Sequence, residues 1–483
     1  MSVITRFAPS PTGFMHIGGV RTALFAWAWA RKNGGTFILR IEDTDQKREI
    51  PGSIEHIKES LMWLELNWDF GPDKPGPFGS CIQSERMASY KDAAQRLIEK
   101  GLAYPDPYTT EEVEQFRKLA DSEKRAFLYR EHRPASPGAW DGTKPLRFKV
   151  PEIKRYRWHD EVRGDLEAGE EALDDFVLIK ADGYPTYNFA HIVDDTAMGI
   201  THIMRGDEFI SSTPRFLSLY DAMGVEYPKF VTLPPILRED KTKKLGKRDG
   251  AKDILEYRTE GYLPEAMRNF LALIGWNPGT EQEIFATTEA LLQSFDISKI
   301  HAHGGVFNED KLRWFNRQYL IAMDDETFVD EGLSVLKSSI EERGLVWNDD
   351  IGRHVLRHLK ERISVWQDLR DIVREGEADF FFADPSPEPS QIPEKKSNPS
   401  EASAHLEKTY SLLEAVKDWS ESAIKNSLWD YATEAGRGAV LWPLRFAITG
   451  LPKSPDPFIV ASIIGKEATL RRVKTAIGSL KTV

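Results

Sequence analysis

Residues 6–22 read RFAPSPTGFMHIGGVRT, and this stretch decides the fold of the N-terminal part of the chain. A short strand candidate at 3–7 ends here in a loop of prolines and glycines, after which residues 20–32 have the composition of a helix. Two glycines at 34–35 stop that helix, and 36–41 is a second strand candidate. Strand, helix and strand in this order predict a parallel α/β unit. Further strand candidates lie at 182–187, 201–205 and 230–233.

The loop between this first strand and the helix is suited to a nucleotide phosphate. Gly18 and Gly19 let a ligand approach the backbone closely. The helix N-terminus points its N–H groups and its positive dipole end at the ligand, and His16 adds a side-chain donor. In an open parallel sheet, ligands bind beyond the carboxyl ends of the strands, where this loop lies. A structural turn with a surface histidine is the alternative, and it would be preferred for an isolated His-x-Gly-Gly.

A second segment is basic and contains glycine. Residues 241–250 read KTKKLGKRDG, so several cations share one loop. Lysine ammonium groups stabilise the charge that accumulates on a pyrophosphate leaving group. An exposed basic linker is the alternative for this segment taken alone.

The longer strings resemble the signatures of one enzyme family. Residues 6–22 resemble the HIGH region of class I aminoacyl-tRNA synthetases. The start at 8–13, APSPTG, is typical of the glutamyl branch, whereas glutaminyl relatives usually start Pro-Glu-Pro-Asn. Residues 244–248 resemble the KMSKS loop, with Gly246 where the family usually has serine. Two further similar stretches are 184–208 and 436–450, and the resemblance covers essentially the whole chain.

The resemblance implies a set of site residues. A glutamate substrate needs arginines for its carboxylates and an acid for its ammonium. The implied glutamate-binding residues are Arg6, Ala8, Ser10, Glu42, Tyr187 and Arg205. Among these, Arg6 and Arg205 would bind carboxylates and Glu42 the ammonium. The implied ATP-binding residues are Gly18, Gly19, Glu208 and Lys247, and the implied catalytic residues are His16, Lys244 and Lys247. The position of His191 varies in the family, and its role stays open.

The resemblance also implies a multidomain protein. We expect an α/β Rossmann-like parallel-sheet catalytic domain with an inserted acceptor-binding subdomain, followed by all-α stem-contact and anticodon-binding domains. The expected boundaries are 1–80 and 190–250 for the catalytic domain, 81–189 for the insertion, 251–322 for the stem-contact domain, 323–383 and 401–483 for two anticodon-binding domains, and 384–400 for a proline-rich linker or loop.

The implied reaction is the ATP-dependent ligation of L-glutamate to tRNA(Glu) through glutamyl-adenylate, with release of AMP and diphosphate. Mg²⁺ would neutralise the phosphates of ATP. The alternatives are an enzyme that also charges tRNA(Gln) with glutamate, a glutaminyl enzyme, and a tRNA-modifying paralogue, which lacks an anticodon domain. A non-catalytic tRNA-binding protein is the alternative from another class, and Gly246 alone favours it.

The bulk composition adds several expected absences. The net charge of −12 does not indicate a nucleic-acid partner, although residues 437–481 are locally basic. No apolar run of membrane length and no basic-then-apolar start is visible, so we expect no membrane contact and no signal peptide. Cys81 is the only cysteine, and the stretches 103–108 and 129–132 lack the thiols that bind zinc in many bacterial relatives. We therefore expect no structural zinc, no metal-binding residues and a cytoplasmic protein. Since the family is commonly monomeric, we also expect a monomer.

Overall fold

The computed structural model describes residues 2–241, 243–246, 252–395 and 397–482. The chain forms two compact units, Met1–Phe315 and Asn316–Val483, and each is described by itself. The boundary between them falls inside helix α10 (Glu309–Ala322).

The first unit is built on a six-stranded sheet. Its strands, in spatial order, are β2 (Thr36–Leu39), β1 (Ile4–Phe7), β8 (His202–Gly206), β9 (Lys229–Leu233), β5 (Tyr156–Asp160) and β6 (Gly164–Ala168). The first five strands pair in parallel, and the β5–β6 pair at one edge is antiparallel. The predicted parallel α/β unit is confirmed.

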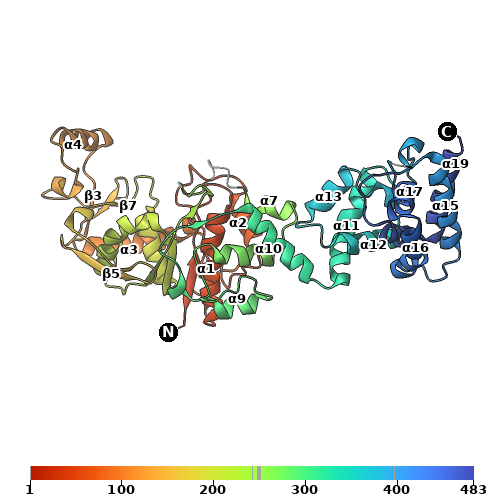
Figure 1. Cartoon of the computed structure of the whole chain (residues 1–483). Helices are drawn as coiled ribbons and strands as arrows, with labels where there is room; N and C mark the ends of the chain where they lie inside the picture. The colour runs from red at the N-terminus through yellow and green to blue at the C-terminus, as the bar shows by residue number, and fades with distance from the viewer. Residues whose placement is uncertain (1, 242, 247–251, 396, 483) are drawn as a thin grey trace. The chain divides into compact units, whose positions relative to one another are not determined.

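Helix α1 (Ile17–Lys32) connects β1 to β2 and lies against the strands of this sheet (Figure 1). Side chains of a strand alternate between the two faces of a sheet. The Thr5 hydroxyl accordingly faces α1, where it donates to the Ala26 carbonyl at 2.7 Å. Arg6 points to the opposite face, toward Asp195 of helix α5 (Tyr187–Ala197). One strand thus supplies both a packing residue and a site residue.

The face opposite α1 is covered by helices that follow later in the chain. These are α3 (Met87–Glu99), α5 and α6 (Thr213–Met223). They form one apolar core with Ile38, Ile203 and Phe230 of the sheet. Ile203 and Phe230 are direct partners across β8 and β9, so they share this face.

Two local predictions need correction. The helix predicted from residue 20 begins at Ile17, because His16 caps its N-terminus. The strand predicted at 182–187 is wrong, since Tyr187 is the first residue of α5. Gly183 turns the chain with φ of +85°, and only Pro185 makes a bridge, to Ile179. The predicted strands at 201–205 and 230–233 are confirmed as β8 and β9.

The stretch between α3 and α5 contributes to two sheets. Strands β3 (Ala103–Pro105), β4 (Leu146–Phe148) and β7 (Val177–Ile179) form a separate antiparallel sheet, and helix α4 (Thr110–Ser122) lies between β3 and β4 in the chain. Strands β5 and β6 come from the same stretch but extend the six-stranded sheet.

The other elements of the first unit are mostly helical. They are α2 (Ser53–Trp63), α7 (Ile254–Thr259), α8 (Pro264–Leu273), α9 (Thr288–Ser294) and the short parallel pair β10 (Ile236–Leu237) and β11 (Gly305–Val306).

The described residues of the second unit form helices and no strand, as predicted. The helices are α11 (Asp325–Glu342), α12 (Asp349–Leu359), α13 (Gln367–Arg374), α14 (Asp379–Phe382), α15 (Pro399–Glu414), α16 (Glu421–Ala435), α17 (Arg437–Thr449), α18 (Pro457–Ile464) and α19 (Lys466–Leu480). In the part of the chain that the structure describes, no helix is long and apolar enough to cross a membrane.

Candidate active site

The carboxyl ends of β1, β2 and β8 bring most of the predicted site residues together. Arg6 lies in β1, and Arg205 lies in β8, one strand away. Glu42 follows β2, and its backbone N–H donates to the Pro9 carbonyl at 3.0 Å. This bond ties the loop that contains Ala8 and the exposed Ser10 to the exit of β2. Such an edge is where open parallel sheets bind ligands.

A chain of buried ion pairs runs beneath this edge. The Arg6 Nε donates to Asp195 at 3.1 Å, and the Arg40 Nη1 donates to the same carboxylate at 2.6 Å. Arg40 also donates to Glu42 Oε1 from Nη2 at 2.9 Å and from Nε at 3.3 Å. Both Arg40 bonds to Glu42 use Oε1, so Oε2 has no hydrogen bond from any residue that the structure describes. This oxygen can accept from the ammonium of an amino acid.

Sequence reasoning missed four charged members of this network, Arg40, Arg86, Asp194 and Asp195. Asp194 accepts from Arg86 Nε at 2.7 Å and from the Tyr90 hydroxyl at 2.8 Å. The available signal was two adjacent aspartates in an otherwise apolar stretch, HIVDD at 191–195. Buried carboxylates need charged or hydrogen-bonding partners. Two aspartates among apolar neighbours are expected to be buried, so they indicate arginine partners elsewhere in the chain.

Charge and burial move the pKa values of two carboxylates in this cluster in opposite directions. Burial alone would raise the pKa of Asp195, but the Arg40 and Arg6 guanidiniums hold that pKa well below its usual range. Burial raises the pKa of Glu42, and Arg40 and Arg6 oppose that rise. The ion-paired cations are Arg6, Arg40 and Arg86, and the anions are Glu42, Asp194 and Asp195.

Arg205 adds one more cation without an anion of its own. It has no ion pair with any described residue, so four cations face three anions and one positive charge is left over. Its Nη2 donates to the Thr213 hydroxyl at 3.0 Å, whereas the buried Nη1 has no partner among the described residues. The rings of Phe209, Phe216 and Phe230 surround its guanidinium, with centroids 5.0–5.4 Å away. A buried cation with a spare donor fits a substrate carboxylate.

Tyr187 and His191 form one wall beside Arg205. Their rings stack with centroids 4.7 Å apart, and His191 also meets Phe216 edge to face. Burial raises the pKa of Tyr187 to about 12 and lowers the pKa of His191 to about 3. The neutral His191 therefore donates from Nδ1 to the Tyr187 carbonyl at 2.7 Å, and its buried Nε2 has no partner among the described residues. His191 belongs to the pocket wall.

His16 shapes the phosphate loop by capping α1. Its Nδ1 accepts from the Gly18 N–H at 3.1 Å, so a neutral ring carries its proton on Nε2. A Cβ on Gly18 would lie 2.9 Å from the His16 ring, which explains the glycine there. A Cβ on Gly19 would come no closer than 3.4 Å to Met15, an ordinary contact. Packing therefore does not require a glycine at position 19, and its lack of a side chain leaves room beside the backbone.

The second predicted motif begins in a tight hairpin after β10. Leu237 and Lys244 form a bridge, and the Leu245 N–H donates to the Ile236 carbonyl at 2.8 Å. The Lys244 Nζ lies 3.1 Å from the Glu208 carboxylate, and both side chains are more than half exposed. The structure thus brings the predicted catalytic residue Lys244 together with the predicted ATP-binding residue Glu208. Lys247 lies outside the described residues.

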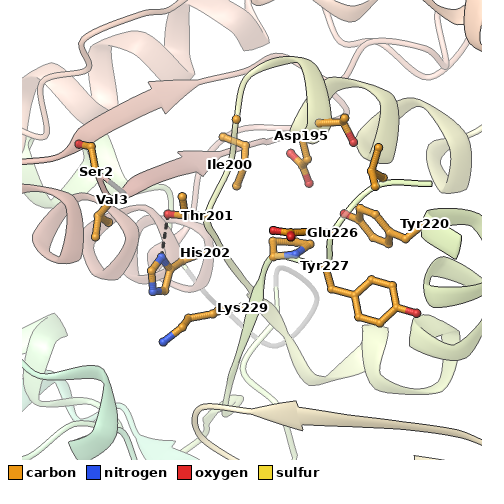
Figure 2. A pocket seen from close by; sticks show the side chains of 14 residues that line it. Ser2, Val3, Asp195, Ile200, Thr201, His202, Tyr220, Glu226, Tyr227 and Lys229 are labelled. Atoms are coloured by element: carbon orange, nitrogen blue, oxygen red, sulfur yellow. Dashed lines mark hydrogen bonds between the residues drawn. The ribbon is translucent and has the colours of Figure 1, made fainter. Parts of the chain in front are cut away.

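The cavity in Figure 2 is at the other edge of the sheet. It has a volume of about 430 Å³ and is lined by Ser2 before β1, by Thr201 and His202 at the start of β8, and by Lys229 at the start of β9. These are the amino ends of the strands. The cavity therefore lies at the opposite ends of the strands from the candidate site, although Asp195 of the buried ion-pair network also lines it.

The stretches that lack zinc-binding thiols are packed by other interactions. Asp106 bonds to the Tyr129 hydroxyl and to Arg147 Nε at 2.6 Å. His132 stacks on Phe116 with centroids 4.1 Å apart. The absence of zinc remains a prediction.

The locally basic C-terminal stretch is partly structural. Arg472 is buried and donates to Asp384 and to the carbonyls of Phe380, Ala383 and Ile448. Arg445 donates to the Ser454 carbonyl at 2.8 Å. Arg437, in contrast, lies over the ring of Trp429 with 4.4 Å to its centroid.

The family model described as "tRNA synthetases class I (E and Q), catalytic domain" matches residues 2–314. The chain belongs to this class I synthetase family. An anticodon-binding domain model matches residues 320–477 of this synthetase, which covers almost all of its helical second unit.

Relatives extend the similarity over the full length of this synthetase. It is 39% identical over 485 residues to the glutamate–tRNA ligase of an Anaeromyxobacter species, with 98% of each chain covered. It is 38% identical over 493 residues to the glutamate–tRNA ligase of Clostridium botulinum, covering 100% of this chain and 99% of the relative. A crystal structure of a glutamate tRNA ligase from Elizabethkingia meningosepticum, in complex with its amino acid, matches with a TM-score of 0.88 and 34% identity, covering 99% of this chain and 100% of that chain.

Proposed function

We propose that this synthetase ligates L-glutamate to tRNA(Glu) with ATP, in two steps through glutamyl-adenylate. The single observation that carries the choice of substrate is Arg205, a buried cation with an unpartnered Nη1 in a cluster with one surplus positive charge. A dicarboxylic amino acid supplies the missing anion. Full-length similarity to glutamate–tRNA ligases supports the same substrate.

In the first step the residues of this chain position two reactants. Arg205 binds one substrate carboxylate, and Glu42 Oε2 accepts from the ammonium. Arg6 is held by Asp195 at 3.1 Å, and three of its five N–H donors are bonded, so it fixes the pocket and keeps donors for a carboxylate. The α-carboxylate of glutamate attacks the α-phosphorus of ATP, and the bond to the β-phosphate breaks, releasing diphosphate. Holding the reactants in line supplies much of the rate.

The phosphates lie over the N-terminus of α1. Backbone N–H groups near Gly18 and Gly19 and the positive end of the helix favour their charge. Lys244 exchanges its 3.1 Å contact with Glu208 for the phosphates, and Lys247 matches the lysine that the family uses on ATP. In the second step the terminal 2′-hydroxyl of tRNA attacks the activated carbonyl, and AMP leaves.

Mg²⁺ belongs to this proposal as a companion of ATP, whose phosphates it neutralises when bound. Among the described residues no cluster of three His, Cys, Asp or Glu side chains could hold a metal ion. Phosphate oxygens and water, the ligands that Mg²⁺ keeps in such sites, would therefore provide its coordination.

Exchange of labelled pyrophosphate into ATP tests the proposal. Purified protein should support exchange with glutamate in the presence of tRNA(Glu), and not with glutamine or aspartate. Absence of exchange with glutamate rejects the proposed activity. Aminoacylation of purified tRNA(Glu) and tRNA(Gln) side by side then measures how selective the charging is.

Lys247→Ala should lower the rate of adenylate formation about a hundredfold while tRNA affinity stays within twofold, because one charge that stabilises the leaving diphosphate is lost. Exchange kinetics and a filter-binding titration measure the two quantities. Lys243→Ala is the matched control, since it removes the same charge from the same segment outside the motif. An equal loss of exchange and of tRNA binding would contradict the role of Lys247.

The proposal includes a monomeric cytoplasmic enzyme. The one cysteine, Cys81, is buried, and burial raises the pKa of its thiol to about 11. A protein without exposed thiols or disulfides suits a reducing compartment. Light scattering of the purified full-length chain checks the oligomeric state.

A further inference from the structure

We propose that His56 is a positioning residue that ties the two ATP-contacting segments of this enzyme together. The inference rests on the proposed function. His56 lies on α2, a helix to which no substrate role has been given above. Its ring contacts the turn just before His16 and, on its other side, the residue at which the chain continues after the Lys244 segment.

The first contact is with the turn just before His16, which contains Phe14 and Met15. The Met15 N–H donates to His56 Nδ1 at 3.3 Å, and the ring of Phe14 stacks on the imidazole with centroids 4.6 Å apart. The Ser60 hydroxyl lies 3.4 Å from the same nitrogen, but it already donates to the His56 carbonyl at 2.6 Å. Since Nδ1 accepts a backbone N–H, it carries no proton, and the proton of the neutral ring is on Nε2.

The second contact uses that proton. His56 Nε2 lies 2.8 Å from Asp253 Oδ1 and 2.7 Å from Oδ2, with side-chain exposures of 12% and 21%. Asp253 is also the N-cap of α7, where its side chain accepts from the Leu255 N–H. One carboxylate therefore both starts a helix and receives the imidazole.

The backbone repeats the same connection. The Ile254 N–H donates to the Met15 carbonyl at 3.0 Å, and His16 and Asp253 form an antiparallel bridge. The chain thus returns from the Lys244 segment directly against the residue that caps α1. His56 closes this junction from the side, with one nitrogen on each partner, so its two bonds fix the separation between Met15 and the start of α7, where the chain continues after the Lys244 segment.

A positioning role predicts a selective effect on ATP. His56→Ala should raise the KM for ATP about tenfold in tRNA-dependent pyrophosphate exchange, the effect of losing a hydrogen bond to a charged group. The KM for glutamate should stay within twofold, because no pocket residue contacts His56. A loss of folding alone would reduce the active fraction without changing either KM.

Conservative variants separate the two bonds. Glutamine places an N–H near the position of Nε2, so His56→Gln should bring the KM for ATP to within threefold of wild type. Asparagine places its acceptor near Nδ1 and does not reach Asp253, so His56→Asn should behave like His56→Ala. Asp253→Asn keeps a good N-cap. Combined with His56→Ala, it should add less than twofold, since the two residues act through one contact.

Glu59→Gln is the matched control. Glu59 pairs with Arg258 at 2.7 Å and so joins the same two helices, α2 and α7, without contacting the turn or Asp253. It should leave both KM values unchanged. The inference is overturned if His56→Ala leaves the KM for ATP within twofold, if it raises both KM values equally, or if His56→Gln does not rescue. A wild-type protein without exchange would instead reject the proposed function itself.

Discussion

Replacing Arg205 by methionine is expected to lower kcat/KM for glutamate about a thousandfold in tRNA-dependent pyrophosphate exchange. The substitution keeps the packing against Phe209, Phe216 and Phe230 but removes the one cation of the buried cluster that has no ion pair with a described residue. A carboxylate buried without its partner costs about 3–5 kcal/mol, and about 1.4 kcal/mol corresponds to a factor of ten. Steady-state exchange at varied glutamate concentration gives the value.

Arg268→Met provides the control for removing a buried arginine. Arg268 is equally enclosed but donates to the Leu64 carbonyl, to Glu65 and to Thr288, far in sequence from the pocket. It should lower stability and leave the KM for glutamate unchanged. Similar glutamate KM values for Arg205→Met and wild type would contradict the role of Arg205 in binding glutamate.

Asp195→Ala is expected to have the largest effect on stability. Its loss leaves the buried Arg6 and Arg40 guanidiniums without their shared carboxylate. Breaking a buried pair in this way costs about 3–5 kcal/mol. The opening free energy of β1 amides, measured by native-state hydrogen exchange, should fall by that amount. Asp182→Ala, which removes a half-exposed partner of Lys180 at 3.4 Å, should cost less than about 1 kcal/mol.

The contribution of Asp195 to the free energy of unfolding depends on pH in a defined direction. The folded-state pKa of Asp195 lies below the ordinary carboxyl value, so its contribution to stability is fully present above about pH 4 to 5. It is lost as the pH falls through the folded-state pKa. The stability gap between wild type and Asp195→Asn should therefore be constant near neutral pH and shrink only in acid. A gap that widened on acidification would contradict the assigned ion pairs.

The sequence allowed the frame of the site to be predicted because that frame is local. A strand, a Pro/Gly loop, a capped helix and a second strand lie within residues 4–39, and their order alone predicts a parallel unit. Arg205 and Glu42 could be placed at the carboxyl ends because each follows or ends a recognisable strand. The His16 cap also moved the start of α1 earlier than composition indicated.

Contacts between distant segments could not be predicted in the same way. Arg40 is only two residues from Glu42 in the chain, but its bond to Asp195 joins residues 155 positions apart. The tyrosines and threonine at 182–187 favour a strand. The stretch instead forms a turn at Gly183 and the start of α5 at Tyr187. His56 lies in an amphipathic helix whose sequence carries no motif. Its partners Met15 and Asp253 are 41 and 197 residues away in the chain. The spacing of apolar residues along the chain does not predict contacts between such distant residues.

The division of the 103–179 stretch between two sheets bears on how such enzymes can be recombined. Strands β3 and β4 are neighbours, so residues 106–145 form the tip of a hairpin whose two ends meet. Strand β5 pairs with β9 and thereby joins the catalytic sheet. A donor segment from a relative can therefore replace the tip with a single graft. A graft that also crosses 156–168 would exchange two strands of the catalytic sheet and would have to match its register.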